Sequence, residues 1–269
     1  MHFFRDFLVT LRISLRAKFS WVILCIFLAC ALGTLLSAYF GGRQPAVVAL
    51  DVGVSIIRLL MPFLIVMLVQ ELFFNEFDRR YYLASLTYPR GRCNLLLGRF
   101  FAFLWVLIFV LLVVGVLQFG LVVFIDAIYP RSAPAVYGHY YLIVFSFIAL
   151  DLLVLMALAT LLAVVASTPS FVLIGTLGFM LVSRSYGDIV DLLGRDAGLV
   201  ANSEAYRESL GVLGYLLPDL GALDLRMLVL YGRPEFLPVD WPWLLLSSLG
   251  YAVGLLALAV WALQRKRFA

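Results

Sequence analysis

LLLGRFFAFLWVLIFVLLVVGVLQFGLVVF, residues 95–124, is apolar enough to place this chain in a membrane. Arg99 is its only charged residue, and nearly every other position is aliphatic or aromatic. An α-helix needs about 20 mostly apolar residues to cross the hydrocarbon core of a bilayer. These residues are therefore predicted to form a transmembrane helix.

Five further segments have the same character, namely 21–40, 50–73, 139–166, 171–185 and 243–263. The segment 171–185 is short, so we expect it to tilt or to continue as apolar helix beyond Tyr186. Hydrophobic residues make up 64% of the 269 residues and charged residues 13%, which is more apolar surface than a soluble domain of this length needs. The sequence predicts an all-α membrane protein with six transmembrane helices in a single transmembrane domain, 1–269. The first segment is expected to be retained and not cleaved as a signal peptide, because the apolar segments continue along the chain.

The basic residues predict the orientation. With six spans they gather on one side of the membrane, and the positive-inside rule makes that side cytoplasmic. Both termini are therefore predicted to be cytoplasmic. The chain has only two lysines, and this skew to arginine is typical of a GC-rich bacterial genome, so the predicted location is a bacterial inner membrane. The residues are Arg5, Arg12, Arg16 and Lys18 before the first span, Arg79, Arg80, Arg90, Arg92 and Arg99 around the second loop, and Arg265, Lys266 and Arg267 after the last span.

Two regions outside the spans are predicted to lie at the membrane surface. Residues 1–20 have an apolar stripe at helical spacing edged by arginines, which indicates an amphipathic helix in contact with lipid. Residues 186–242 form an acidic periplasmic or outer-leaflet segment with apolar runs at 210–217 and 223–230, which we expect to be short helices. Pro218 followed by Asp219 indicates a break and then a capped helix start.

The sequence has no recognisable catalytic motif. The phosphate-binding loop GxxxxGK[ST], the nucleophile motif GxSxG and the zinc motif HExxH are all absent. The chain has only two histidines and three cysteines, the cysteines without metal spacing, so we expect no metal or cofactor and no enzymatic activity on this chain. The net charge of +4 is too small and too scattered to indicate nucleic-acid binding.

Charged residues inside the spans are costly and usually have a partner. Arg58 lies in the second span with Asp51 two helical turns before it, and Asp151 lies in the middle of the fourth span. An ion pair of Arg58 with Asp151 or with Asp51 is predicted. The pair either fixes helix packing or, together with Pro218 and Asp219, lines a substrate path.

The polar interruption between the second and third spans reads QELFFNEFDRRYYLASLTYPRGRCNLLLGRFF, residues 70–101. Its sequence resembles the cytoplasmic coupling region of ABC-2 transporter permeases. That region has a glutamate after span two, a short helix with paired leucines, Pro-x-x-Arg, and a glycine with a basic residue at the start of span three. Matching positions here are Glu76, Leu83, Leu86, Pro89, Arg92, Gly98 and Arg99, whereas EFDRRYY replaces the usual Glu-x-x-x-Gly-Thr run. The alternative is an ordinary basic inner loop.

The resemblance implies that 74–94 is a cytoplasmic coupling loop with a coupling helix, and that this chain is the permease subunit of an ATP-driven exporter. It implies two copies of a separate ATPase subunit that binds ATP and magnesium, and a second permease chain, as a homodimer or with a sister chain. Residues 1–20 could then also contact the ATPase. The coupling residues would be Glu76, Arg79, Arg80, Tyr82, Leu86, Pro89 and Arg92.

The cargo is expected to be amphipathic, lipid-linked or peptide-like, although the machine could instead do mechanical work on a periplasmic partner. Two other classes of protein stay open. One is a membrane assembly scaffold that binds no ATPase, and the other is a membrane enzyme that modifies lipids and needs Asp151 or carboxylates of the outer segment.

Overall fold

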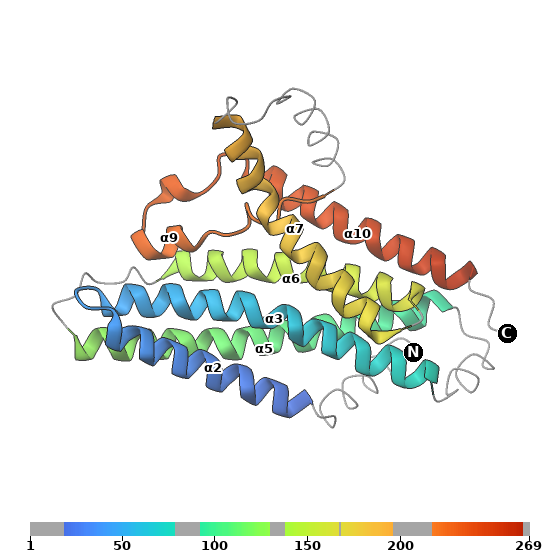
Figure 1. Ribbon diagram of the computed structural model, residues 1–269, viewed down its shortest axis with the longest axis horizontal. Helices are drawn as coiled ribbons and strands as arrows, with labels where there is room; N and C mark the ends of the chain where they lie inside the picture. The colour runs from blue at the N-terminus through green and yellow to red at the C-terminus, as the bar shows by residue number, and fades with distance from the viewer. Residues whose placement is uncertain (1–18, 79–91, 130–137, 167, 196–216, 266–269) are drawn as a thin grey trace.

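The computed structural model describes residues 19–78, 92–129, 138–166, 168–195 and 217–265 (Figure 1). In this part of the chain the regular structure is entirely helical, without strands. Among these residues six helices are long and apolar enough to cross a membrane, which confirms the predicted all-α membrane fold. The elements are α2 (Phe19–Phe40), α3 (Pro45–Asp78), α5 (Arg92–Ile128), α6 (His139–Val165), α7 (Pro169–Arg195), α9 (Arg226–Tyr231), the 3-10 helix η1 (Pro234–Phe236) and α10 (Trp241–Arg265).

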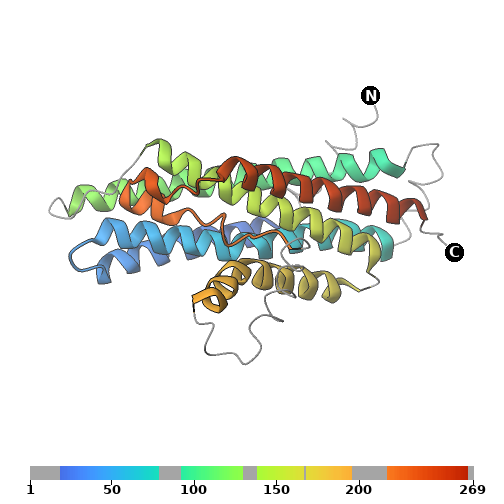
Figure 2. The ribbon, with the colours of Figure 1, turned by 90° about the horizontal axis from the view of Figure 1, so that it is seen from above.

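Four of the long helices, α2, α3, α5 and α6, run side by side along the long axis of the molecule, and α10 packs along α6 (Figure 1). The helix α7 crosses them obliquely and lies alone on one side of the bundle, as Figure 2 shows from above. It packs against α6 and α3. The short helix α9 also contacts α6 and α3, so a segment predicted to lie outside the spans is attached to the bundle.

A tight turn joins α2 to α3 and marks one end of the bundle, called here the turn end. Gly42 has a φ of +55°, a left-handed conformation that favours glycine. At Gly41 an added Cβ would lie 2.9 Å from the Cα of Pro45, so this position also needs glycine. Pro45 begins α3, where its missing N–H costs nothing.

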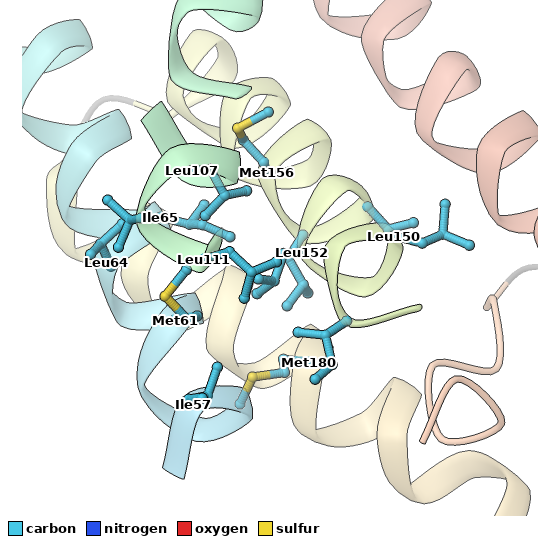
Figure 3. Close-up of a cluster of buried hydrophobic side chains, with 14 of the residues drawn as sticks. Ile57, Met61, Leu64, Ile65, Leu107, Leu111, Leu150, Leu152, Met156 and Met180 are labelled. Carbon is cyan, nitrogen blue, oxygen red and sulfur yellow. The ribbon is translucent and has the colours of Figure 1, made fainter. Parts of the chain in front are cut away.

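The core lies where α3, α5, α6 and α7 meet (Figure 3). Fully or almost fully buried side chains from these helices interlock there, and they include Ile57, Met61, Leu107, Leu152, Met156 and Met180. The helices α2, α5, α7 and α10 also expose many large apolar side chains. Lipid tails are as apolar as leucine, so such a surface fits a bilayer.

A buried amide ties α5 to the α2–α3 hairpin. Gln118 of α5 accepts a hydrogen bond from the Thr34 hydroxyl at 2.8 Å and donates one to the Ala49 carbonyl at 3.2 Å. Gly53 leaves the necessary space, because a Cβ there would lie 1.7 Å from the Gln118 Nε2. In apolar surroundings such bonds also fix which helix faces meet.

The helix boundaries differ from the prediction at several points. The helix α7 continues to Arg195, so 186–195, assigned from sequence to the outer segment, is helical. The predicted helix start after Pro218 and Asp219 is wrong: the chain there is irregular, and the helix expected at 223–230 is Arg226–Tyr231. The Asp219 side chain instead closes a local turn by accepting the Ala222 N–H at 3.1 Å.

Several predicted features fall outside the described residues. They are residues 1–18 of the amphipathic helix, residues 79–91 of the coupling loop and the apolar run 210–216.

Candidate charged site between α3, α6, α7 and α9

The site begins with a proline inside α3. Pro62 has no N–H, so the carbonyl of Arg58, four residues earlier, lacks its partner in the helical hydrogen-bond pattern. Arg184 of α7 replaces that partner, donating from its Nη1 to the Arg58 carbonyl at 3.1 Å. A freed backbone group in a membrane helix needs such a substitute, because the hydrocarbon offers none.

Asp151 of α6 holds the same two arginines from the other side. Its side chain is fully buried, and its Oδ2 accepts a hydrogen bond from the Arg184 Nη2 at 2.5 Å. The same oxygen lies 3.7 Å from the Nε of Arg58. Of the two ion pairs predicted for Arg58, the pair with Asp151 is confirmed.

The pair of Arg58 with Asp51 is wrong. These residues are about 10 Å apart along the axis of α3, since each helical residue rises 1.5 Å. Asp51 instead pairs with Arg226 at 3.2 Å, and Arg226 also donates to the Ser55 hydroxyl at 2.6 Å. A residue from the predicted outer segment therefore takes the place assigned to Arg58.

The segment 217–231 reaches between α3 and α7 and is bound there by polar contacts. Arg58 forms an ion pair with Asp224 and donates from its Nη2 to the Leu220 carbonyl at 2.8 Å. The Ser183 hydroxyl of α7 donates to the Pro218 carbonyl. This segment is thus inserted into the charged site and is not a detached loop.

These contacts join into one row of alternating charge, called here the ion-pair chain. Arg226 connects Asp51 to Asp224, with 2.9 Å between its Nε and the Asp224 Oδ2, and Arg58 connects Asp224 to Asp151. Three carboxylates and three guanidinium groups alternate, so the charges compensate one another in apolar surroundings. In order the members are Asp51, Arg226, Asp224, Arg58, Asp151 and Arg184.

A cavity of about 770 Å³ opens beside the ion-pair chain and is called here the charged cavity. Its volume is within the range of small-molecule sites, about 300–1,000 Å³. One wall is apolar and comes from Met227, Leu230 and Tyr231 of α9. The charged lining consists of Asp51, Arg58, Arg184, Asp219, Asp224 and Arg226.

Asp219 differs from the other carboxylates of the cavity. Its Oδ1 accepts the Ala222 N–H, but it has no arginine partner among the described residues. Two glycines let it approach α7: a Cβ at Gly187 would lie 2.8 Å from the Asp219 Oδ2, and one at Gly221 would lie 2.5 Å from the Arg184 carbonyl. The backbone is therefore shaped to hold this carboxylate at the wall of the cavity.

The residues proposed for the substrate path come together in space. Arg58 and Asp219 line the charged cavity, Asp151 lies behind Arg58 and Arg184, and Pro218 bonds to α7 next to them. The proposed coupling residues are not placed by the structure: Glu76 lies in the last turns of α3 and Arg92 begins α5, but their side chains are not described. Outside the described residues lie Arg79, Arg80, Tyr82, Leu86 and Pro89.

Sequence reasoning missed three members of the ion-pair chain. Arg184 had a signal, because it is a charged residue inside the predicted fifth span, 171–185, and Pro62 leaves an unpaired carbonyl that needs a donor. Asp224 and Arg226 had none, since they lie in an acidic segment that looks like any translocated loop. Within the described ranges, no cluster of three or more His, Cys, Asp or Glu side chains is arranged to hold a metal ion.

Comparison of the sequence with models of known protein families and with curated proteins gives no match. The class defined by the fold is an all-α membrane protein with six helices fit to span the bilayer and a charged cavity between them.

Proposed function

We propose that this chain is the membrane-spanning permease subunit of an ATP-driven exporter of the ABC-2 type. The observation that carries the proposal is the length of α3 and α5, which flank residues 79–91. They have 34 and 37 residues, which correspond to about 51 and 56 Å at 1.5 Å per residue. The hydrocarbon core is about 30 Å thick, so both helices exceed it.

The extra length of α3 lies at the end opposite the turn end. The apolar part of α3 ends at Gln70, but the helix continues to Asp78, and α5 begins at Arg92. A protein that gripped the Arg-rich residues between them would hold two rigid helices at once. The helix α3 also supplies Arg58 to the charged cavity, so a displacement of α3 would reach that cavity directly.

The proposal assigns ATP and magnesium to a separate ATPase, present in two copies, because this chain has no phosphate-binding loop. A second permease chain, as a homodimer or a sister chain, would complete the path. The assembly would sit in a bacterial inner membrane with both termini cytoplasmic. Its cargo would be amphipathic, lipid-linked or peptide-like. In the alternative form of the proposal, the same complex does mechanical work on a periplasmic partner.

The test is affinity purification of the chain from its native membrane in mild detergent, followed by mass spectrometry and an ATPase assay. The wild type is expected to bring down a stoichiometric chain that carries GxxxxGK[ST], with ATP turnover. The double charge reversal Arg79→Glu with Arg80→Glu is expected to lose both. The matched control reverses two other basic residues predicted on the same side, Arg265→Glu with Lys266→Glu, and should keep them.

A chain that purifies alone and without ATP turnover contradicts the proposal and favours the assembly scaffold. The chain is a lipid-modifying enzyme if it modifies a lipid, and if this lipid-modifying activity depends on Asp151 and survives the Arg79 and Arg80 reversal.

A further inference from the structure

We propose that the charged cavity binds the cationic head group of an amphipathic molecule, an alkyl ammonium compound, with Asp219 as its counter-ion and Tyr231 as its aromatic wall. The role of this molecule as cargo rests on the proposed export function. The binding itself does not, because all the groups that recognise the ligand belong to this chain.

The charge balance of the whole site is negative by one, because the buried Asp151 behind the cavity adds to a lining of three carboxylates and three guanidinium groups. The ion-pair chain contributes three carboxylates and three guanidinium groups, and Asp219 adds a fourth carboxylate. In a site with a low local dielectric constant, one uncompensated carboxylate attracts a cation strongly. The described part of the chain supplies no cation for it, so the ligand can.

The free hydrogen-bonding capacity points the same way. Both Nη atoms of Arg58 and both Nη atoms of Arg184 already have partners within the site. On the acceptor side, the Oδ2 of Asp219 and the Oδ2 of Asp51 have no partner among the described residues. Three buried atoms of the site are also unpaired, the Oδ1 of Asp151 and the Nε atoms of Arg58 and Arg184, but a ligand in the cavity cannot reach them. Among the groups that line the cavity, Asp219 and Asp51 therefore offer acceptors, which suit an ammonium group, and the Nη2 of Arg226 is the donor left for an anion.

The opposite wall suits both ends of an amphipathic cation. Tyr231 lines the cavity, and its ring packs against Phe236 with 5.8 Å between centroids, which orients it. Aromatic rings attract ammonium groups through the negative face of the ring. Met227 and Leu230 extend this wall with apolar surface, and Met227 is exposed, so an alkyl chain could leave the cavity along α9.

The experiment measures the thermal unfolding of the purified chain in dodecyl maltoside as a function of added probe. The probes are octylammonium, octyl sulfate and octyl glucoside, which share a chain length and differ in head-group charge, and methylammonium, which lacks the chain. Octylammonium is expected to raise the unfolding temperature of the wild type saturably. The sulfate and the glucoside should not, and methylammonium should bind more weakly because it misses the apolar wall.

Two pairs of variants test the assigned groups. Asp219→Asn keeps the acceptor for the Ala222 N–H and removes only the charge, so the apparent Kd for the cation should rise roughly tenfold or more. Glu235→Gln removes an exposed carboxylate of η1 outside the cavity and should leave the Kd unchanged. Tyr231→Leu should weaken binding, whereas Tyr231→Phe, which keeps the aromatic face, should not.

Equal affinity in Asp219→Asn and the wild type overturns the assignment, as does saturable stabilisation by octyl sulfate in place of the cation. Because no ATPase is present, this result is independent of the purification experiment. If the cation binds but no ATPase co-purifies with the chain, the assignment of the cavity is supported and the proposed export function is refuted.

Discussion

Replacing Asp151 by asparagine should destabilise the protein strongly, because this one carboxylate holds two arginines. Asparagine has nearly the same shape but no charge, so the change isolates the electrostatic part. Asp151 lies 2.5 Å from the Nη2 of Arg184 and 3.7 Å from the Nε of Arg58, and its side chain is fully buried. Two unit charges about 4 Å apart attract by about 4 kcal/mol at an effective dielectric constant of 20.

The expected loss is about 3 kcal/mol in the free energy of unfolding, at the lower end of the range for breaking a buried ion pair. It is at the lower end because Arg58 keeps Asp224 as a second partner, so mainly Arg184 loses its counter-charge. The free energy is measured by titrating the protein in mixed micelles with dodecyl sulfate and following helical circular dichroism. Asp126→Asn is the matched control: Asp126 lies half-buried in α5, without an ion-pair partner among the described residues, and should change stability by less than about 0.5 kcal/mol.

A second substitution makes the reasoning refutable. In Asp151→Asn with Arg184→Gln, the charge left unpaired by the first change is gone, and glutamine can still donate to the Arg58 carbonyl. The double variant should therefore be more stable than the sum of the two single losses predicts, by about 1–3 kcal/mol. Strict additivity, or a loss in Asp151→Asn no larger than in Asp126→Asn, would show that the ion-pair chain does not stabilise the fold as described.

Three further predictions concern the contacts between helices and use the same titration. Gly53→Ala should lower the free energy of unfolding by about 1–3 kcal/mol, because the new methyl group displaces the amide of Gln118. Adding Gln118→Ala should recover part of this loss. An unchanged free energy of unfolding in Gly53→Ala would contradict the close packing. Pro62→Ala returns the missing N–H to α3, so Arg184→Gln should lower the free energy of unfolding less in that variant than in the wild type. An equal loss in both would mean that Arg184 does not replace the hydrogen bond that Pro62 removes. Tyr141→Phe removes a 2.6 Å hydrogen bond to a carbonyl of α5 and should lower the free energy of unfolding by about 1 kcal/mol. An unchanged midpoint of the unfolding titration would contradict this hydrogen bond.

The spans and the inner charge pair were predictable because the bilayer imposes strict rules. Length and hydropathy identify the long helices, and a charge inside an apolar span demands a partner. Arg58 and Asp151 follow from those rules alone. Their position relative to Arg184 does not, since several face-to-face arrangements of the spans satisfy the same pattern.

The insertion of 217–231 was not predictable from its residues. Acidic side chains and prolines are typical of a translocated loop, and nothing local distinguishes Asp224 or Arg226 from solvated charges. Their role depends on the cleft that the oblique α7 leaves beside α3, which is a tertiary property. The coupling residues such as Arg79 stay a prediction, because they lie outside the described residues.

The ion-pair chain also sets a condition on biosynthesis. Asp51 and Arg58 are translated early, whereas their partners in the inserted segment come much later: Arg226 follows Asp51 by 175 positions, and Leu220 follows Arg58 by 162. A ribosome releases the chain from its N-terminus, so α3 must wait in or near the bilayer with these groups unmatched. The last third of the polypeptide then completes the ion pairs of a helix made among the first, and a nascent chain that stops before residue 217 still has Asp151 for Arg58 but lacks the arginine partner of Asp51.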